Sequence, residues 1–99
     1  MSRKVEHIDG NRLVELFEEV DSYQFLDVRS PMEYNSGNID AFSNIPLQEL
    51  QQNIETLEKD KPVVVICESG SRSVYAARIL SKVGFEKILN VRGGMSALR

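Results

Sequence analysis

Apolar residues along the chain alternate between helical spacing and short continuous runs. Helical spacing occurs in three segments, at residues 13–20, 47–57 and 76–83. Short apolar runs lie between them, at residues 24–28, 63–66 and 87–91, and a weaker one falls within Arg3–Ile8. The two periods predict helices and strands in turn. Such alternation is typical of α/β folds, so we expect three layers, with a mostly parallel sheet of about five strands flanked by helices on both faces.

Residues at the ends of the three predicted helices support the helix boundaries that the apolar spacing gives. Asp9 can cap the first helix, Pro46 suits the entry to the second, and Gly84 suits the end of the third. The β-branched run Val63–Ile66 fits a strand that is buried on both faces, as in a parallel sheet. The remaining segments are predicted to be connections and a short tail, at residues 30–37, 58–62 and 92–99.

The length and charge of the chain limit its organisation and its partners. With 99 residues there is room for one modest core, so we expect a single domain over residues 1–99. Acidic and basic residues are interspersed at a net charge of −3, and no basic face indicates a nucleic-acid partner. The longest apolar run, Val63–Cys67, is too short to cross a membrane, and the N-terminal segment is no signal peptide. One cysteine cannot form an internal disulfide, so we expect a reducing, cytoplasmic location.

The only cysteine, Cys67, lies where the most apolar strand ends and a polar turn begins. Ligands of open α/β sheets bind beyond the carboxyl ends of the strands, and a strand, turn and helix N-terminus in this order direct backbone N–H groups to one point. We therefore expect a thiolate nucleophile at Cys67, with Arg72 adding a positive charge nearby. Ser71 and Ser73 are predicted to cap the following helix. The predicted active-site loop after the cysteine comprises Glu68, Ser69, Gly70, Ser71, Arg72 and Ser73.

The spacing between Cys67 and Arg72 bears on what this loop can hold. The pattern is Cys-x4-Arg, whereas protein tyrosine phosphatases resemble it but use Cys-x5-Arg, a wider cradle that holds a phosphate. A loop that is one residue shorter makes a smaller ring, which fits a single extra sulfur atom on the cysteine better than a phosphoryl group. A phosphatase-like activity is disfavoured, but loop dihedrals can vary, so spacing alone does not decide.

Several motifs, taken in order, resemble those of single-domain rhodaneses, the sulfurtransferase homology domains. The segment Phe25–Leu47 is similar to the family's Asp-Val-Arg, Glu-Tyr/Phe, Gly-His-Ile and Asn-Ile-Pro landmarks. The segment Cys67–Ser73, CESGSRS, resembles the active-site loop Cys-x-x-Gly-x-Arg-Ser. Later landmarks of the family are matched by Gly84-Phe85 and Val91–Met95. The resemblance covers nearly the whole chain and implies the rhodanese-like fold.

The resemblance implies transfer of a sulfane sulfur through a persulfide on Cys67. The thiolate would take the outer sulfur of thiosulfate or of a thiol persulfide, and a thiol or cyanide would remove it in a second half-reaction. No metal and no organic cofactor are implied. The expected partners are a small sulfur donor and a thiophilic acceptor, or a sulfur-relay protein. A binding or redox-sensing module of the same fold, without useful turnover, stays open as an alternative.

Three features depart from the family's pattern. Asn38 stands where the family has a histidine, which we interpret as structural tuning. Leu98 stands about where an aromatic residue follows the two glycines. Glu68 makes the loop acidic, and a negative charge should slow the capture of an anionic donor. We therefore expect thiosulfate to be a poor donor, with a thiol persulfide or a protein donor preferred.

Other residues at this edge are expected to support the loop rather than to react. Asp27 and Arg29 lie at the end of a predicted strand, and we expect a structural ion pair with Glu33 or with the loop. Gly93 and Gly94 are expected to supply unusual backbone conformations near the loop. These residues complete the predicted site.

Overall fold

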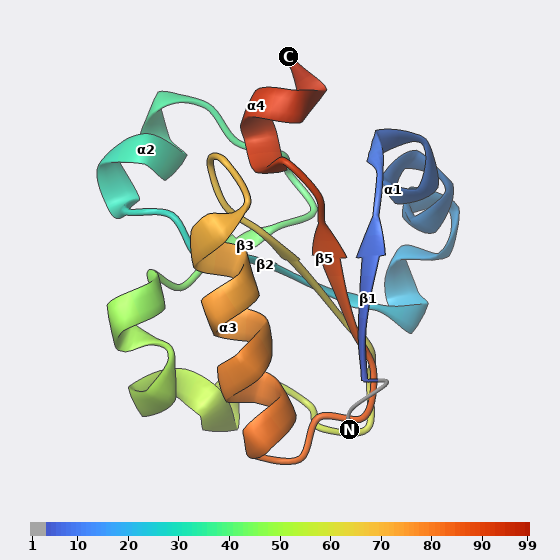
Figure 1. Ribbon diagram of the computed structural model, residues 1–99, viewed down its shortest axis with the longest axis vertical. Coiled ribbons are helices and arrows are strands. Elements are labelled where there is room, and N and C mark those ends of the chain that lie inside the picture. The colour runs from blue at the N-terminus through green and yellow to red at the C-terminus, as the bar shows by residue number, and fades with distance from the viewer. Residues whose placement is uncertain (1–3) are drawn as a thin grey trace.

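The computed structural model describes residues 4–99 and contains one parallel sheet (Figure 1). Its five strands lie in the order β1-β5-β4-β2-β3, and every neighbouring pair is parallel. The strands are β1 (Val5–Ile8), β2 (Gln24–Asp27), β3 (Ser43–Asn44), β4 (Val63–Ile66) and β5 (Ile88–Val91). The predicted parallel α/β fold is therefore confirmed. The first strand was expected within Arg3–Ile8, of which residue 3 lies outside the described residues.

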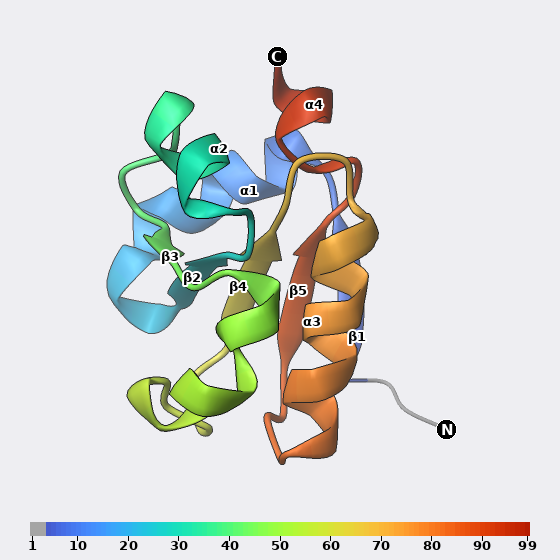
Figure 2. The same ribbon diagram turned by 90° about the vertical axis from the view of Figure 1, so that its left-hand side faces the viewer.

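Helices cover both faces of this sheet and give the expected three layers (Figure 2). The α-helices are α1 (Gly10–Leu16), α2 (Pro31–Ser36), α3 (Ser71–Lys82) and α4 (Gly94–Leu98). The 3₁₀ helices are η1 (Phe17–Ser22), η2 (Leu47–Glu49) and η3 (Gln51–Thr56). Helix α3 packs on one face with residues of η2 and η3, and α1 packs on the other. Helices α2 and α4 lie at the end of the molecule to which the strands point (Figure 1).

Strand β4 lies at the centre of the core, because its side chains alternate between the two faces of the sheet. Val63 and Val65 pack with Leu80 on the face covered by α3, whereas Val64 and Ile66 pack in the cluster on the other face. All four side chains are buried, which confirms the prediction of a strand buried on both faces. Each such side chain contributes about 1.5–3 kcal/mol relative to an exposed one, so the strand firmly positions the loop that follows it.

The expected helix boundaries are confirmed at three places. Asp9 Oδ1 accepts a hydrogen bond from Arg12 N at 2.9 Å and so caps α1. Pro46 precedes η2 as its N-cap residue. Gly84 follows α3 with φ of 107°, a left-handed conformation that glycine adopts without a Cβ clash.

Residues 47–57 do not form the single helix that their apolar spacing predicts. They form η2 and η3, in which Asn53 N donates to Leu50 O at 3.0 Å, the spacing of a 3₁₀ helix. Asn53 Nδ2 donates to Glu49 O at 2.8 Å. Side chains that compete for backbone carbonyls in this way favour short turns over a long α-helix.

The first helix also ends earlier than predicted. The backbone tightens to η1 at Phe17, and Glu19 interrupts it with φ of −128° and ψ of 42°. The interruption turns Val20 away from the core, where the helical spacing had placed it, and its side chain is 46% exposed. Phe17 keeps its expected place against the core.

The predicted connection at residues 30–37 is wrong, because most of it forms α2. Ser30 Oγ accepts a hydrogen bond from Glu33 N at 3.2 Å, and Glu33 Oε1 accepts one from Ser30 N at 2.9 Å. Pro31 occupies the first turn, which suits its fixed φ. This capping box was visible in the sequence as Ser-Pro-x-Glu. The expected tail at residues 92–99 likewise contains a helix, α4.

Candidate active site

Cys67 directly follows β4, at the carboxyl edge of the sheet, where the sequence predicted it. Its side chain is buried, and its sulfur accepts a hydrogen bond from Gly70 N at 3.0 Å. The sulfur also lies 3.4 Å from Ser73 Oγ. In the described part of the chain, one amide and one hydroxyl thus contact the sulfur, fewer groups than the several amides expected. The Gly70 amide can donate to a thiolate, whereas the Ser73 hydroxyl accepts from the thiol and gives its one proton to Gly70 O.

The conformation of the loop depends on Gly70. This residue precedes α3 with φ of 103°, and a Cβ on it would lie 3.1 Å from Gly93 N. The left-handed conformation directs Gly70 N back toward the sulfur of Cys67. Glycine is therefore required here both for the turn and for the close approach of a neighbouring backbone.

The two serines of the loop do not cap α3, so that prediction is wrong. Among residues 4–99, no side chain makes a capping hydrogen bond at the start of this helix. Ser73 is fully buried, and its hydroxyl donates to Gly70 O at 3.1 Å while it contacts the sulfur of Cys67. Ser71 is exposed, as is Ser69. Ser73 therefore belongs to the surroundings of the sulfur, as a residue of the predicted loop, but it does not have the capping role that was expected.

Helix α4 presses on the other side of the loop. Met95 N donates to Cys67 O at 2.8 Å, and Ser96 N donates to Glu68 O at 2.9 Å. Gly94 makes this approach possible, since its φ is 60° and a Cβ on it would lie 2.3 Å from Cys67 O. The expected role of Gly93 and Gly94 near the loop is thereby confirmed, with φ of 76° at Gly93. The amides of α4 were missed, because the hydrogen bonds join residues far apart in sequence.

Arg72 does not point a free charge at the sulfur but pairs with α2. Its guanidinium donates to Glu33 Oε1 at 2.7 Å and to Glu33 Oε2 at 2.9 Å, in a bidentate arrangement. This guanidinium, followed by the Ser30 N–H, lowers the pKa of Glu33 to about 2. The carboxylate of Glu33 in turn raises the pKa of Arg72. The pair ties the first turn of α3 to the first turn of α2.

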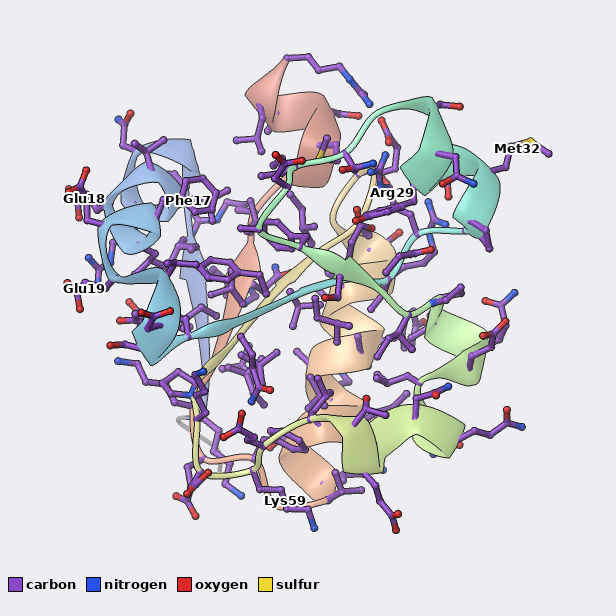
Figure 3. All side chains as sticks on the ribbon, turned by 180° about the vertical axis from the view of Figure 1, so that it is seen from behind. Phe17, Glu18, Glu19, Arg29, Met32 and Lys59 are labelled. Atoms are coloured by element: carbon purple, nitrogen blue, oxygen red, sulfur yellow. The ribbon has the colours of Figure 1, made fainter. Side chains whose placement is uncertain are left out.

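Asp27 and Arg29 form an ion pair with each other, which the sequence did not predict, and both side chains are 1% exposed. Arg29 Nη2 lies 2.9 Å from Asp27 Oδ2 and also donates to Gly37 O at 2.8 Å. Of the two partners expected for these residues, Glu33 or the loop, the loop is confirmed for Arg29, since Arg29 Nη1 lies 3.3 Å from Glu68 Oε1. The hydrogen bond to Asp27 is the main cause that raises the pKa of Arg29. Figure 3 labels Arg29 at this end of the molecule.

Glu68 is held by three side chains rather than left free in solvent. Its carboxylate accepts hydrogen bonds from both terminal nitrogens of Arg99, from Ser96 Oγ at 3.2 Å and from Arg29. The hydrogen bond from Arg99 is the main cause that lowers the pKa of Glu68. No local sequence pattern indicated Arg99 as a partner.

Asn38 stands at the family's histidine position. Its Nδ2 donates to Tyr34 O at 2.9 Å and so binds the end of α2, in keeping with a structural role.

Two other kinds of feature are absent from the described residues. Within residues 4–99, no group of three or more histidine, cysteine, aspartate or glutamate side chains could hold a metal ion. No helix in that range is long and apolar enough to span a membrane. The reactive group that the structure shows at this edge is the cysteine sulfur, which contacts an amide and a hydroxyl and is buried among core residues.

Comparison with known proteins places these features in one family. The sequence profile described as the rhodanese-like domain matches residues 10–99. The chain is 42% identical over 71 residues to the protein YqhL of Bacillus subtilis, covering 72% of this chain but 56% of that protein, so it spans little more than half of this relative. It is 35% identical to thiosulfate sulfurtransferase GlpE of Shewanella oneidensis, covering 92% of this chain and 89% of that protein. The crystal structure of a rhodanese-like domain protein from Staphylococcus aureus has a TM-score of 0.87 at 28% identity and covers 95% of this chain and 91% of that one.

Proposed function

The chain belongs to the family of rhodanese-like domains, and we propose that it is a sulfurtransferase in which Cys67 carries the transferred sulfur as a persulfide. One observation carries the proposal: the sulfur lies beyond the end of the central strand, 3.0 Å from Gly70 N. A similarity to the thiosulfate sulfurtransferase GlpE over most of both chains supports the same activity. Residues 1–99 act as one rhodanese-like domain in this proposal.

The reaction consists of two nucleophilic displacements at sulfur. The Cys67 thiolate attacks the outer sulfur of thiosulfate; a sulfur–sulfur bond forms, the donor's sulfur–sulfur bond breaks, and sulfite leaves with the electron pair. Cyanide or a thiolate then attacks the outer sulfur of the persulfide, and the electron pair of the broken bond returns to Cys67. Both steps balance without an external oxidant or a cofactor, and a two-step exchange of this kind gives ping-pong kinetics.

Around the sulfur, the loop residues Glu68 to Ser73 have separate tasks. Gly70 N stabilises negative charge on the sulfur before the attack and on the persulfide after it, while the Ser73 hydroxyl donates to Gly70 O and so holds the turn that directs this amide. The amides of α4 hold the carbonyls of Cys67 and Glu68, so the loop keeps its shape when the sulfur is added. The ion pairs of Arg72 and Arg29 connect the loop to α2 and β2.

The proposed partners follow from this chemistry. They are a small sulfane-sulfur donor and a thiophilic acceptor, such as a thiol in the cell or cyanide in an assay, or a protein that relays sulfur. A single cysteine, which cannot form an internal disulfide, is consistent with a cytoplasmic site of action.

Mass spectrometry of the loaded protein tests the proposal. After incubation with thiosulfate or with a thiol persulfide, the peptide that contains Cys67 should gain the mass of one sulfur atom. Cyanide should remove this sulfur and release thiocyanate in equal amount. A stable sulfenic acid on Cys67 without sulfur transfer would instead favour a redox-sensing module of the same fold. Phosphate release from an aryl phosphate that depends on Cys67 would favour phosphatase chemistry.

A further inference from the structure

The carboxylate beside the nucleophile is shared by two arginines from distant parts of the chain. Glu68 Oε1 lies 3.3 Å from Arg29 Nη1 and 3.4 Å from Arg99 Nη2, while Oε2 accepts hydrogen bonds from Arg99 Nη1 and from Ser96 Oγ. Arg29 follows β2 and is 1% exposed, whereas the side chain of Arg99, at the end of α4, is 57% exposed. Glu68 thus binds two guanidiniums, that of Arg29, which is buried in the core, and that of Arg99, which is exposed at the surface.

The charges of the site are balanced as a result. In the part of the chain that the structure describes, three guanidiniums at the loop each lie against a carboxylate. The pairs are Arg29 with Asp27, Arg72 with Glu33, and Arg99 with Glu68. A dianion such as thiosulfate therefore approaches guanidiniums that already have partners, and it must compete with Glu68 for the donors of Arg29 and Arg99. This competition differs from the simple repulsion by a free carboxylate that the sequence suggested.

A pocket of about 300 Å³ adjoins the loop at the same place. Arg29, Glu68 and Arg99 line it together with Glu33, Ser36, Gly37 and Met32, and the side chain of Met32 is 79% exposed. In Figure 3, Met32 projects from the surface at the same end of the molecule as Arg29. A thioether offers an apolar and polarisable contact but no charge. The pocket thus combines neutralised charges with an apolar group, which suits a donor that carries little charge of its own.

We propose that Glu68 is a specificity-determining residue that, by occupying Arg29 and Arg99, selects thiol persulfides over thiosulfate as sulfur donors. This inference rests on the proposed sulfurtransferase function. In the favoured step, the Cys67 thiolate attacks the terminal sulfur of RS–SH, a sulfur–sulfur bond forms to Cys67, and the donor's sulfur–sulfur bond breaks. The electron pair leaves with the RS⁻ thiolate, and the proton stays on the new persulfide. The persulfide of an uncharged thiol carries at most one negative charge in all, whereas the thiosulfate ion carries two.

The test compares two donors on the same sulfur. Quenched-flow mass spectrometry gives the second-order rate constant for persulfide formation on Cys67, first with thiosulfate and then with the persulfide of 2-mercaptoethanol. The measured quantity is the ratio of the thiosulfate constant to the persulfide constant. In the wild type this ratio should lie below one. In Glu68→Gln it should rise by about tenfold at low ionic strength, because Arg29 and Arg99 lose their competing charge, and the rise should shrink as salt is added.

Two further variants show whether a change in the donor ratio is specific to the charges of Glu68 and its arginine partners. Glu55→Gln changes the net charge by the same amount at an exposed position of η3, and its ratio should equal that of the wild type. Arg99→Gln removes the exposed guanidinium without touching the buried ion pair, and its ratio should fall below that of the wild type. Arg99→Gln also decides the question if Glu68→Gln does not fold.

The outcomes separate this inference from the proposed function. Persulfide formation with both donors, at a ratio that neither Glu68→Gln nor Arg99→Gln changes, overturns the role of Glu68 and leaves the sulfurtransferase intact. A wild type that prefers thiosulfate also overturns it. If neither donor adds sulfur to Cys67 in the wild type, the proposed function itself fails, and the donor preference fails with it.

Discussion

Two strand-to-helix junctions lie side by side at the carboxyl edge of the sheet, and they begin their helices differently. Strands β2 and β4 are neighbours, with Asp27 opposite Ile66. After β2, side chains close the start of α2, because Ser30 and Glu33 satisfy each other's backbone N–H groups. After β4, the helix starts from Gly70, and no side chain in the described chain caps it. The amide of Gly70 is directed at the sulfur of Cys67 instead.

The difference shows how two junctions with the same order of strand and helix can have different functions. A helix N-terminus whose donors are satisfied by its own side chains is rigid and has few donors left for a ligand. A junction with glycine at the same place leaves its donors for an anion. The two junctions are also connected, by Arg72 with Glu33 and by Arg29 with Glu68. The capped junction thus acts as a support for the reactive one.

Removing the sulfur should have the largest effect, because it takes away the group that the uncapped junction holds. Cys67→Ser and Cys67→Ala should both fold, as shown by cooperative thermal unfolding, since either side chain is small enough for the buried position. Transfer of sulfur from either donor to cyanide should fall by on the order of 10³-fold or more, because no covalent intermediate can form. Thiocyanate formation measures the transfer. Unchanged transfer in either variant would remove Cys67 from the mechanism.

Forcing α4 away from the reactive junction should have the next largest effect. In Gly94→Ala, the new Cβ would lie 2.3 Å from Cys67 O, and the residue would have to keep φ of 60°. We expect the free energy of unfolding in urea to fall by about 3 kcal/mol, from backbone strain and displaced hydrogen bonds. Transfer should fall as well, since the amide of Met95 can no longer hold Cys67 O.

Gly37→Ala is the matched control for this change. Gly37 follows α2, and a Cβ on it would have nothing within 4 Å. Its substitution should change the free energy of unfolding by less than about 1 kcal/mol. Equal stability of Gly94→Ala and Gly37→Ala would show that the close contact between α4 and the loop is not needed.

Most of the fold followed from sequence because it depends on local periodicity. The central strand Val63–Ile66 and helix α3 have strong apolar patterns, and both form as predicted. The helix predicted at residues 47–57 fails because Asn53 competes for backbone carbonyls, which apolar spacing does not record. Helix α2 was missed although its capping box was present in the sequence. Periodicity therefore predicts which faces are buried better than it predicts how the backbone turns between them.

The candidate site was predictable only where its residues are close in sequence. The place of Cys67 and the need for glycine at Gly94 follow from local motifs and are found in the structure. The partners of Glu68 and Arg72 lie just after β2, just after α4 and in α2, and no local pattern specifies which cation meets which carboxylate. Long-range pairing is set by how the elements pack, so the electrostatic role of Glu68 could be argued correctly only from the structure.

A variant with a smaller expected effect should separate the charge of Glu33 from the shape of its side chain in the capping box. Glu33→Gln keeps a side chain that can complete the capping box but removes the charge that faces Arg72. The two side chains are 36% and 34% exposed, so solvent screening limits the loss of unfolding free energy to about 1 kcal/mol at pH 7. Urea denaturation of the variant and the wild type measures it.

The difference in unfolding free energy between the wild type and Glu33→Gln should depend on pH. Arg72, and then the Ser30 N–H, lower the pKa of Glu33 from its ordinary 4.5 to about 2 in the folded protein. Because the folded pKa is the lower one, the stabilisation is complete above the unfolded value and is lost as the pH falls through the folded value. The stability difference between wild type and Glu33→Gln should therefore shrink as the pH falls from 4.5 to about 2. A difference that stays constant over this range would mean that the pair does not stabilise the fold through charge.

The smallest effect tests the cap itself. In Ser30→Ala, the Glu33 N–H loses the acceptor that now lies 3.2 Å away, while the ion pair with Arg72 remains. We expect the free energy of unfolding to fall by about 1 kcal/mol or less, the usual contribution of a serine N-cap. Ser22→Ala, at an exposed position of η1, is the control and should change the free energy of unfolding less.

Sulfur transfer should be retained in Ser30→Ala, because the groups that contact the sulfur belong to the other junction. If transfer fell as far as in Gly94→Ala while stability hardly changed, the capped junction would take a direct part in the reaction, and the separation of tasks between the two junctions would be wrong.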